Sequence, residues 1–262
     1  MKKIVVPDAY TRRVVKANDL IQNSRFNLTL QQQKIVLYLI SQIRPEDKEF
    51  KLYEFSIGEF CKVCGIDETS GKNYKDLKAA IKEIADKSLW VETETGEETL
   101  LRWIEKPYIN KKNGLIKIRL DEDMKPFLLQ LKKNFTKYEL LWTLHFKSKY
   151  TIRLYELVKS IHSYDLVEYK RIFTLDKLRT LLGAENYTTW QTFKARALEP
   201  AINEINNYSD KLVSYQVIKK GRSVDKIELT VASRDGLEKL RIAAILENDI
   251  ETLEDLSAVK AF

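Results

Sequence analysis

The chain has 262 residues, of which 44% are hydrophobic, and it carries a formal net charge of +7. That length suits two domains of ordinary size, and the apolar content excludes wholesale disorder. With only 8 glycines and 5 prolines, most of the chain should be regular structure, and the positive charge favours a polyanionic partner.

The charge is distributed unevenly along the chain. From Arg234 onward there are four basic and seven acidic side chains, a net charge of −3, so residues 1–233 carry +10. Two cysteines cannot make a disulfide framework, no secretory signal opens the chain, and no apolar run is long enough to span a membrane. We therefore expect a cytoplasmic protein that does not contact a membrane, with a basic body and an acidic tail.

The first half combines helices with short strands after a basic N-terminal arm, residues 1–17. Apolar spacing and capping residues predict helices at 29–43, 56–65, 72–87 and 121–131. Alternating apolar residues predict strands at 50–55, 88–95, 99–108 and 115–120, separated by turns at Gly96 and at Asn113-Gly114.

The second half repeats this order of elements. A helix starting at Leu140 or Tyr150 runs through Ile161, and the next predicted elements are a strand at 169–173, a helix at 174–183, a long helix at 188–209 and a hairpin at 212–231. Pro200 interrupts the long helix, so we expect a kink there.

Helix, strand, helix, turn, helix and hairpin is the order of a winged helix, a helix-turn-helix with a β wing. Two tandem matches predict an α+β fold of two winged-helix domains, mostly helical, with short β hairpins as wings. The predicted boundaries are 18–135 for the first domain, 136–233 for the second, and 234–262 for an acidic, helical tail.

The third helix of the first domain has a basic face beside its apolar one. The polar residues expected to bind DNA there are Lys72, Asn73, Lys75, Lys78 and Lys82. Lysine acts as a mobile point charge, so this face suits phosphate contacts better than base recognition. A solvated lysine face is the alternative interpretation.

The third helix of the second domain has different chemistry. Thr189, Thr192 and Arg196 lie on one outer stripe, which suits base recognition in a major groove, whereas Lys194 projects nearer the apolar face. The wing residues Lys219, Lys220 and Arg222 should meet the DNA backbone or minor groove. A solvated amphipathic helix is again the alternative.

Three patterns resemble catalytic or ligand sites but fail on spacing. Cys61 and Cys64 have zinc spacing without a second pair, and the segment 65–73 departs from a phosphate loop in length and in its last residue. His145 and His162 are too far apart for the paired histidines of a rolling-circle nuclease. We therefore expect no catalytic residue, metal or cofactor.

Three stretches resemble the replication initiator (Rep) proteins of iteron-containing, theta-replicating plasmids, the RepB/RepE-like family. They are VKANDLI with LTLQQQK (15–21 and 28–34), YTIRLYEL (150–157) and FKARALEPAINEI (193–205), and together they span most of residues 14–232. The acidic tail lies outside these stretches.

The resemblance implies a non-enzymatic protein with two winged-helix domains, the second of which contacts bases through residues 189–196. It implies monomers that bind directly repeated double-stranded origin DNA. It also implies homodimers, formed through the first domain and in equilibrium with the monomers, that repress the protein's own promoter. Finally, it implies recruitment of a host replication initiator and helicase. Two alternatives stay open: a transcriptional regulator of the same fold without a role in replication, and a nickase or primase-type enzyme.

Overall fold

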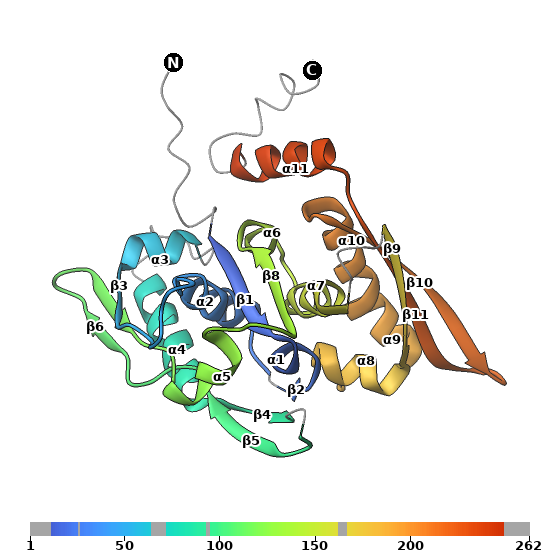
Figure 1. Ribbon diagram of the computed structural model, residues 1–262, viewed down its shortest axis with the longest axis horizontal. Helices are drawn as coiled ribbons and strands as arrows, with labels where there is room; N and C mark the ends of the chain where they lie inside the picture. Colours follow the sequence, from blue (N-terminus) through green and yellow to red (C-terminus); the bar gives the residue numbers. More distant parts are fainter. Residues whose placement is uncertain (1–11, 26, 64–71, 93–94, 162–166, 249–262) are drawn as a thin grey trace.

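The structure, a computed structural model, describes residues 12–25, 27–63, 72–92, 95–161 and 167–248 (Figure 1). These residues form two winged-helix units that meet at one buried helix. The first unit extends from α2 to β7 and the second from α7 to β11. The predicted fold class, two tandem winged helices, is confirmed.

The first unit has the predicted order of elements. Its helices are α2 (Leu30–Ile40), α3 (Ile57–Val63) and α4 (Lys72–Asp86), and its sheet contains β3 (Tyr53–Ser56), β6 (Tyr108–Asn110) and β7 (Leu115–Ile118). A capping box starts α2, because the Thr29 hydroxyl accepts from the Gln32 N–H while the Gln32 side chain accepts from the Thr29 N–H. The antiparallel strand order is β3-β7-β6.

The second unit repeats this topology with longer strands. It contains α7 (Lys149–Ile161), β9 (Glu168–Thr174), α8 (Leu175–Leu182), α9 (Trp190–Phe193), a π-helical turn (Lys194–Leu198), α10 (Glu199–Tyr208), β10 (Lys211–Lys220) and β11 (Ser223–Ser233). Thr174 caps α8, and Gly183 ends it with a φ of +64° that favours glycine. The strand order β9-β11-β10 matches β3-β7-β6. Strands β10 and β11, of 10 and 11 residues, are longer than the short hairpin predicted.

Further elements surround the first unit. They are β1 (Arg13–Ala17), α1 (Asn18–Gln22), β2 (Ser24–Arg25), β4 (Ser88–Glu92), β5 (Glu98–Arg102), α5 (Lys125–Leu128), β8 (Phe135–Glu139) and α6 (Leu141–Leu144). The hairpin β4–β5 pairs with β2 and stays apart from the winged sheet. The wing of the first unit is therefore the later hairpin, β6–β7, although β4–β5 follows α4 directly.

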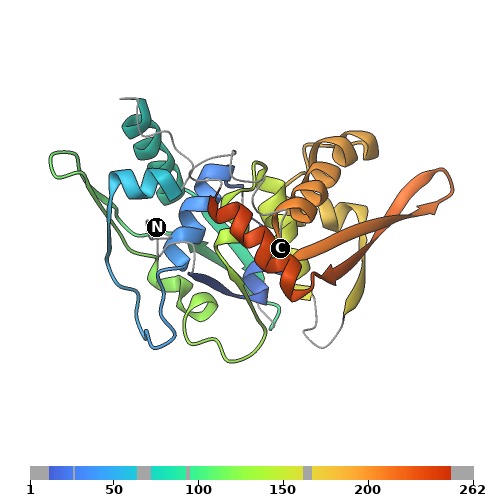
Figure 2. The ribbon, with the colours of Figure 1, turned by 90° about the horizontal axis from the view of Figure 1, so that it is seen from above.

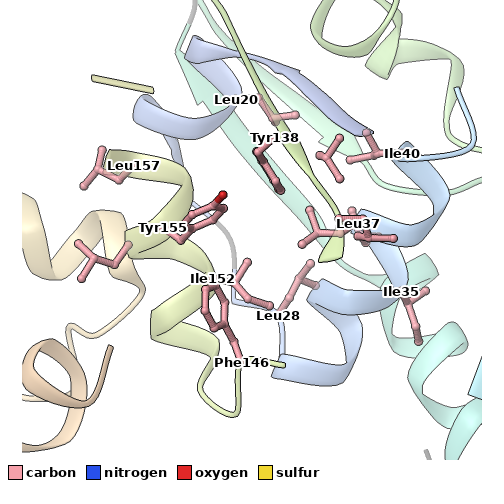
Figure 3. Packing of buried hydrophobic residues seen from close by; sticks show 14 of the residues in the cluster. Leu20, Leu28, Ile35, Leu37, Ile40, Tyr138, Phe146, Ile152, Tyr155 and Leu157 are labelled. Carbon is pink, nitrogen blue, oxygen red and sulfur yellow. The ribbon is translucent and has the colours of Figure 1, made fainter. Parts of the chain in front are cut away.

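Helix α7 forms the joint between the two units. Its residues 150–158 are all buried, and it packs against α1, α2 and β8 on one side and against α8 and α10 on the other. Figure 3 shows Ile152, Tyr155 and Leu157 of α7 among Leu28, Leu37 and Tyr138, all in one apolar core. A helix that is buried on every side fixes its neighbours relative to one another.

Charged groups inside the joint are paired. The Lys16 Nζ lies 2.6 Å from the Glu156 carboxylate, which also accepts from the Tyr138 hydroxyl at 2.5 Å. Burial, reinforced by the Glu156 carboxylate, raises the pKa of Tyr138 well above its ordinary value, so Tyr138 stays a hydrogen-bond donor. The Arg153 Nε donates to the Leu181 carbonyl at 2.9 Å. These contacts tie β1, β8 and α8 to the same helix.

Three predictions about elements need correction. Residues 13–17 of the expected arm form β1, which pairs with β8, while residues 1–11 lie outside the described ranges. The strand predicted at 99–108 is divided between β5 and β6, and the helix predicted at 121–131 is a 3₁₀ turn (Glu122–Met124) followed by the short α5. Within the acidic tail, α11 (Gly236–Asn248) is helical and packs on α6 through Ile242 and Leu246.

The interruption predicted at Pro200 is a π-helical turn just before the proline. Proline has no N–H, so the carbonyl four residues earlier, that of Arg196, has no helical partner at this position. The Glu199 N–H instead donates five residues back to the Lys194 carbonyl. The long helix predicted at 188–209 is therefore one continuous element over residues 190–208, with a local change in helical repeat.

Candidate nucleic-acid interface

The two third helices lie on the same side of the molecule. We call α4 the first recognition helix, and α9, the π-helical turn and α10 together the second recognition helix, because each is the third helix of a winged unit. Figure 2 shows both along one edge, with the wings β6–β7 and β10–β11 at the outer ends. A rod-shaped partner along this edge meets all four elements.

The second recognition helix begins at a hydroxyl cap. The Thr189 Oγ1 accepts from the Thr192 N–H at 3.2 Å, and the Thr192 Oγ1 donates to the Thr189 carbonyl at 3.0 Å. Both threonines are exposed. The structure therefore gives them a capping role in addition to the base contacts predicted for them.

Arg196 and Lys194 differ in how far their charges are compensated. Arg196 is exposed on the π-helical turn, and its side chain makes no ion pair or hydrogen bond with a residue that the structure describes. The Lys194 side chain is 41% exposed, and its Nζ lies 3.3 Å from the Glu199 carboxylate. Lys194 thus lies outside the core, although the helical wheel placed it near the apolar face, and Glu199 holds it.

Aromatic packing joins the second recognition helix to its wing. The rings of Trp190 and Tyr215, a residue of β10, are 6.2 Å apart at 69°, an edge-to-face arrangement. The Tyr215 hydroxyl also donates to Glu199 at 3.1 Å. Burial, together with this hydrogen bond, raises the pKa of Tyr215 to about 12, so Tyr215 is protonated at neutral pH.

The second wing ends in a tight basic turn. Lys220 pairs with Ser223 across two turn residues, of which Gly221 comes first with a φ of +63°. Glycine is the residue that most readily adopts this conformation. The predicted contacts Lys219, Lys220 and Arg222 are all exposed here. The wing therefore carries three cations to its tip.

The first recognition helix presents lysines on a solvent-exposed face. Lys75, Lys78 and Lys82 are exposed, whereas Leu77 and Ile81 are buried beneath them. Lys82 pairs with Asp86 one turn later, and this hydrogen bond raises the pKa of Lys82. The positive charge of Lys82 is thereby partly compensated, which leaves Lys75 and Lys78 as the stronger candidates for phosphate contacts. The predicted side chains of Lys72 and Asn73 lie outside the described part of the structure.

The sequence analysis missed the basic tip of the first wing. Lys111 and Lys112 are exposed there, in a turn closed by the Asn110 side chain, which accepts from the Lys112 N–H at 3.1 Å. The Lys111 Nζ lies 5.4 Å from the ring centre of Tyr74, near the start of α4. The available signal was the likeness between Lys111-Lys112 before Asn113-Gly114 and Lys219-Lys220 before Gly221.

The patterns set aside in the sequence analysis gain no support as metal sites. Cys61 is buried, while Cys64, His162 and most of the segment 65–73 lie outside the described residues. Among the residues that are described, no group of three or more His, Cys, Asp or Glu side chains is placed to hold a metal ion. None of the described helices is long and apolar enough to cross a membrane.

Comparisons with known proteins match a family model to each half of the chain, and the first match also includes most of α7. Residues 13–159 match the family model described as Initiator Replication protein, WH1, and residues 174–231 match the one described as Initiator Rep protein, WH2. The chain is 27% identical over 223 residues to a replication initiation protein of Escherichia coli, covering 82% of this chain and 67% of that protein.

A solved structure shares the arrangement of both units. The crystal structure of Pi initiator protein in complex with iteron DNA matches with a TM-score of 0.68 at 20% identity, covering 86% of this chain and 99% of that chain. At this identity the likeness shows a common fold of two winged-helix domains.

Proposed function

Because the chain belongs to the family of initiator replication proteins, we propose that it starts plasmid replication by sequence-specific binding to directly repeated origin DNA, the iterons. The observation that carries the proposal is the placement of both recognition helices and both basic wings along one edge. The similar Pi initiator was crystallised with iteron DNA, which supports the same ligand here.

The two units contribute differently to DNA binding. Lys75 and Lys78 on α4, with the cations at both wing tips, neutralise phosphates and release counterions, which supplies affinity without sequence preference. Arg196 on the second recognition helix supplies base recognition, because its planar guanidinium can donate two hydrogen bonds to one guanine. Thr189 and Thr192 add short contacts beside it, and Lys194, held by Glu199, contacts phosphate at the rim of this helix.

Origin opening follows from the binding of several copies of the protein to neighbouring repeats. Protein bound at adjacent repeats bends and strains the duplex beside them, which eases local melting. We further propose that monomers bind the repeats, that homodimers repress the protein's own promoter, and that the bound protein recruits a host replication initiator and helicase in the cytoplasm. The proposed role is non-enzymatic, since binding energy alone drives these steps.

Footprinting on the DNA that flanks the gene tests the proposal. We expect protection of tandem repeats spaced by about 20 base pairs, since two winged helices each span about one helical turn. Protection should weaken in Arg196→Ala and persist in Lys133→Ala, whose side chain is exposed on the segment between α5 and β8.

Two outcomes would favour the alternatives. A single inverted repeat without tandem sites would indicate a transcriptional regulator. Cleavage of supercoiled DNA after addition of Mg²⁺ would indicate a nickase, and primer synthesis a primase.

A further inference from the structure

A groove of about 750 Å³ lies beside β1 and β8, and we call it the basic groove. One wall is the outer face of the β1–β8 ribbon, with Val15, Phe135 and Lys137. The C-terminal end of α2 and the residues after it also line the groove, as do Tyr53 and the segment around Leu128. The volume falls within the range of sites that bind ligands in proteins, roughly 300–1,000 Å³.

The rim of the basic groove is strongly positive. Its cationic residues are Arg12, Arg13, Arg44, Lys51 and Lys137, and none of the described residues that line it is acidic. Lys51 pairs with the buried Asp47, whereas the side chains of Arg13, Arg44 and Lys137 form no ion pair with a described residue. Several cations around one cavity repel each other, and an anionic ligand relieves that repulsion.

The wall also holds an unused hydrogen-bond donor. The Tyr53 hydroxyl has no hydrogen-bond partner among the described residues. Burial, with the nearby Asp47 carboxylate, raises the pKa of Tyr53 to about 12, so the phenol carries its proton at neutral pH. Tyr53 therefore adds a protonated hydroxyl, with no partner among the described residues, to the lining of the groove.

The basic groove lies away from the DNA-binding edge. In Figure 2 the recognition helices occupy the upper edge, whereas the segment between α2 and β3 and the segment around α5, which both line the groove, lie at the lower edge. A duplex on the recognition helices does not cover this side. The positive charge here is therefore available to a second anionic partner.

The apolar lining favours a peptide over a nucleic acid. Four aliphatic side chains, Ile40, Ile43, Leu128 and Leu131, line the groove together with Val15. Single-stranded nucleic acid stacks successive bases on several exposed aromatic rings. Among the described residues, the aromatic ones that line this groove are only Phe135, which is 37% exposed, and the partly buried Tyr53. Aliphatic pockets within a basic rim complement a chain that alternates leucine-like residues with carboxylates.

We propose that the basic groove binds an acidic peptide segment of a protein partner, whose aliphatic side chains fill the groove while its carboxylates meet Arg13, Arg44 and Lys137. The site accepts this partner while DNA occupies the recognition helices. This inference goes beyond DNA binding and does not depend on which DNA sequence is recognised.

Fluorescence anisotropy of the full chain tests the proposal with a labelled peptide that repeats Glu-Leu-Glu-Glu. We expect saturable binding, and a loss of about tenfold or more in Lys137→Glu, because a charge-assisted contact becomes a repulsion. Phe135→Ser should weaken binding as well, since it removes apolar wall. The matched control is Lys133→Glu, an equal change of charge at an exposed residue outside the groove, which should bind the peptide like the wild type.

Two controls define the ligand chemistry. A Glu-Ser-Glu-Glu peptide should bind much more weakly, because it lacks the aliphatic anchors. Random-sequence duplex DNA, saturating the other edge, should leave the Glu-Leu-Glu-Glu peptide bound.

Three results would overturn the proposal: equal binding by both peptides, displacement of the peptide by duplex, or equal loss in Lys137→Glu and Lys133→Glu. Tighter groove-dependent binding of oligo-dT than of peptide would assign the site to single-stranded DNA instead. Duplex binding is measured separately for Lys137→Glu and Lys133→Glu. A loss of peptide binding with unchanged duplex binding concerns the groove alone, whereas a loss of duplex binding concerns DNA recognition.

Discussion

The same dipeptide, Asp-Lys, occurs at the end of both recognition helices, yet the two carboxylates have different surroundings. Asp86 ends α4 and is exposed, and it pairs with Lys82 in its own helix. Asp210 follows α10 and is buried, where it accepts from the Tyr155 hydroxyl at 2.7 Å and from the Lys159 Nζ at 2.8 Å. Only the second carboxylate ties its recognition helix to α7, the joint of the molecule.

The apolar face of the first recognition helix packs in the core, but its polar contacts with the rest of its unit lie near the surface. The Gln32 side chain of α2 donates to the Glu83 carboxylate at 2.5 Å and accepts from the Lys87 Nζ at 2.8 Å. The Lys87 and Glu83 side chains are 35% and 55% exposed, so water competes for these contacts. A firmly placed helix suits base recognition, which depends on geometry, whereas phosphate contact tolerates movement. The attachment of the two helices thus agrees with their different side chains.

Replacing each aspartate tests this difference in attachment most strongly. Asp210→Asn should lower the free energy of unfolding by about 3–5 kcal/mol, because it leaves the Lys159 charge buried without a counter-charge. Asp86→Asn should leave the urea midpoint almost unchanged, because its pair with Lys82 is exposed. Urea unfolding at neutral pH measures both. Equal losses would mean that the Asp210 pair contributes no more than a surface contact.

Acid unfolding gives a second view of the same pair. Burial acts to raise the pKa of Asp210, but Lys159 and the Tyr155 hydroxyl outweigh it, so this pKa lies below its ordinary value. The stabilisation is therefore complete above the unfolded pKa of about 3.9 and is lost as the pH falls through the lower folded value. Asp210→Asn should flatten the loss of stability below about pH 4, and Asp86→Asn should retain the wild-type slope.

Base recognition by the second unit is tested at Arg196. Arg196→Ala should cost about 1–3 kcal/mol of specific binding and relax preference at one or two base positions. Lys194→Ala is the matched control, since Glu199 already compensates Lys194 and its loss should affect specific and random DNA alike. Competition assays with random duplex separate the two effects. If Arg196→Ala weakened random DNA equally, its role would be phosphate contact.

The order of elements could be predicted from the sequence because hydrophobic period, caps and glycine stops act locally. Thr174 and Gly183 define α8 without help from distant residues. Pairings between distant segments could not be predicted in this way. The partners of Asp210 lie 55 and 51 residues earlier, and β1 appeared to be a basic arm because its partner β8 lies far along the chain.

The candidate site shows the same division between local and distant information. Lys75, Lys78 and Lys82 of α4 and the outer stripe of the second recognition helix are exposed, because helix periodicity determines which face is buried. The first wing was missed because β4–β5 has the same alternation as a wing, and only pairing with β3 distinguishes β6–β7 from it. Tyr74 and Trp190 each contact a wing, and helix periodicity alone does not reveal these contacts between distant segments.

Phosphate binding by the first unit is tested at Lys78. Lys78→Ala should weaken binding to all sequences alike and lower the slope of log K against log salt by about one, because one fewer counterion is released. Lys82→Ala should change the slope less, since Asp86 already neutralises part of its charge. Titrations at several salt concentrations measure both slopes. An unchanged slope in Lys78→Ala would make Lys78 part of a solvated face.

The smallest expected effect concerns how the first wing is held. Tyr74→Leu removes the ring beneath the Lys111 Nζ, a cation–π contact worth about 0.5–1 kcal/mol at an exposed site. Losing it should loosen the tip of β6–β7 and weaken DNA binding about two- to fivefold without changing sequence preference. Tyr108→Leu is the control: its ring lies 5.6 Å from the Lys106 Nζ, within the same wing and away from α4. Equal effects of the two substitutions would mean that Lys111 binds phosphate without help from the first recognition helix. Among the described residues, only the second wing, which packs on Trp190, would then be held by its recognition helix.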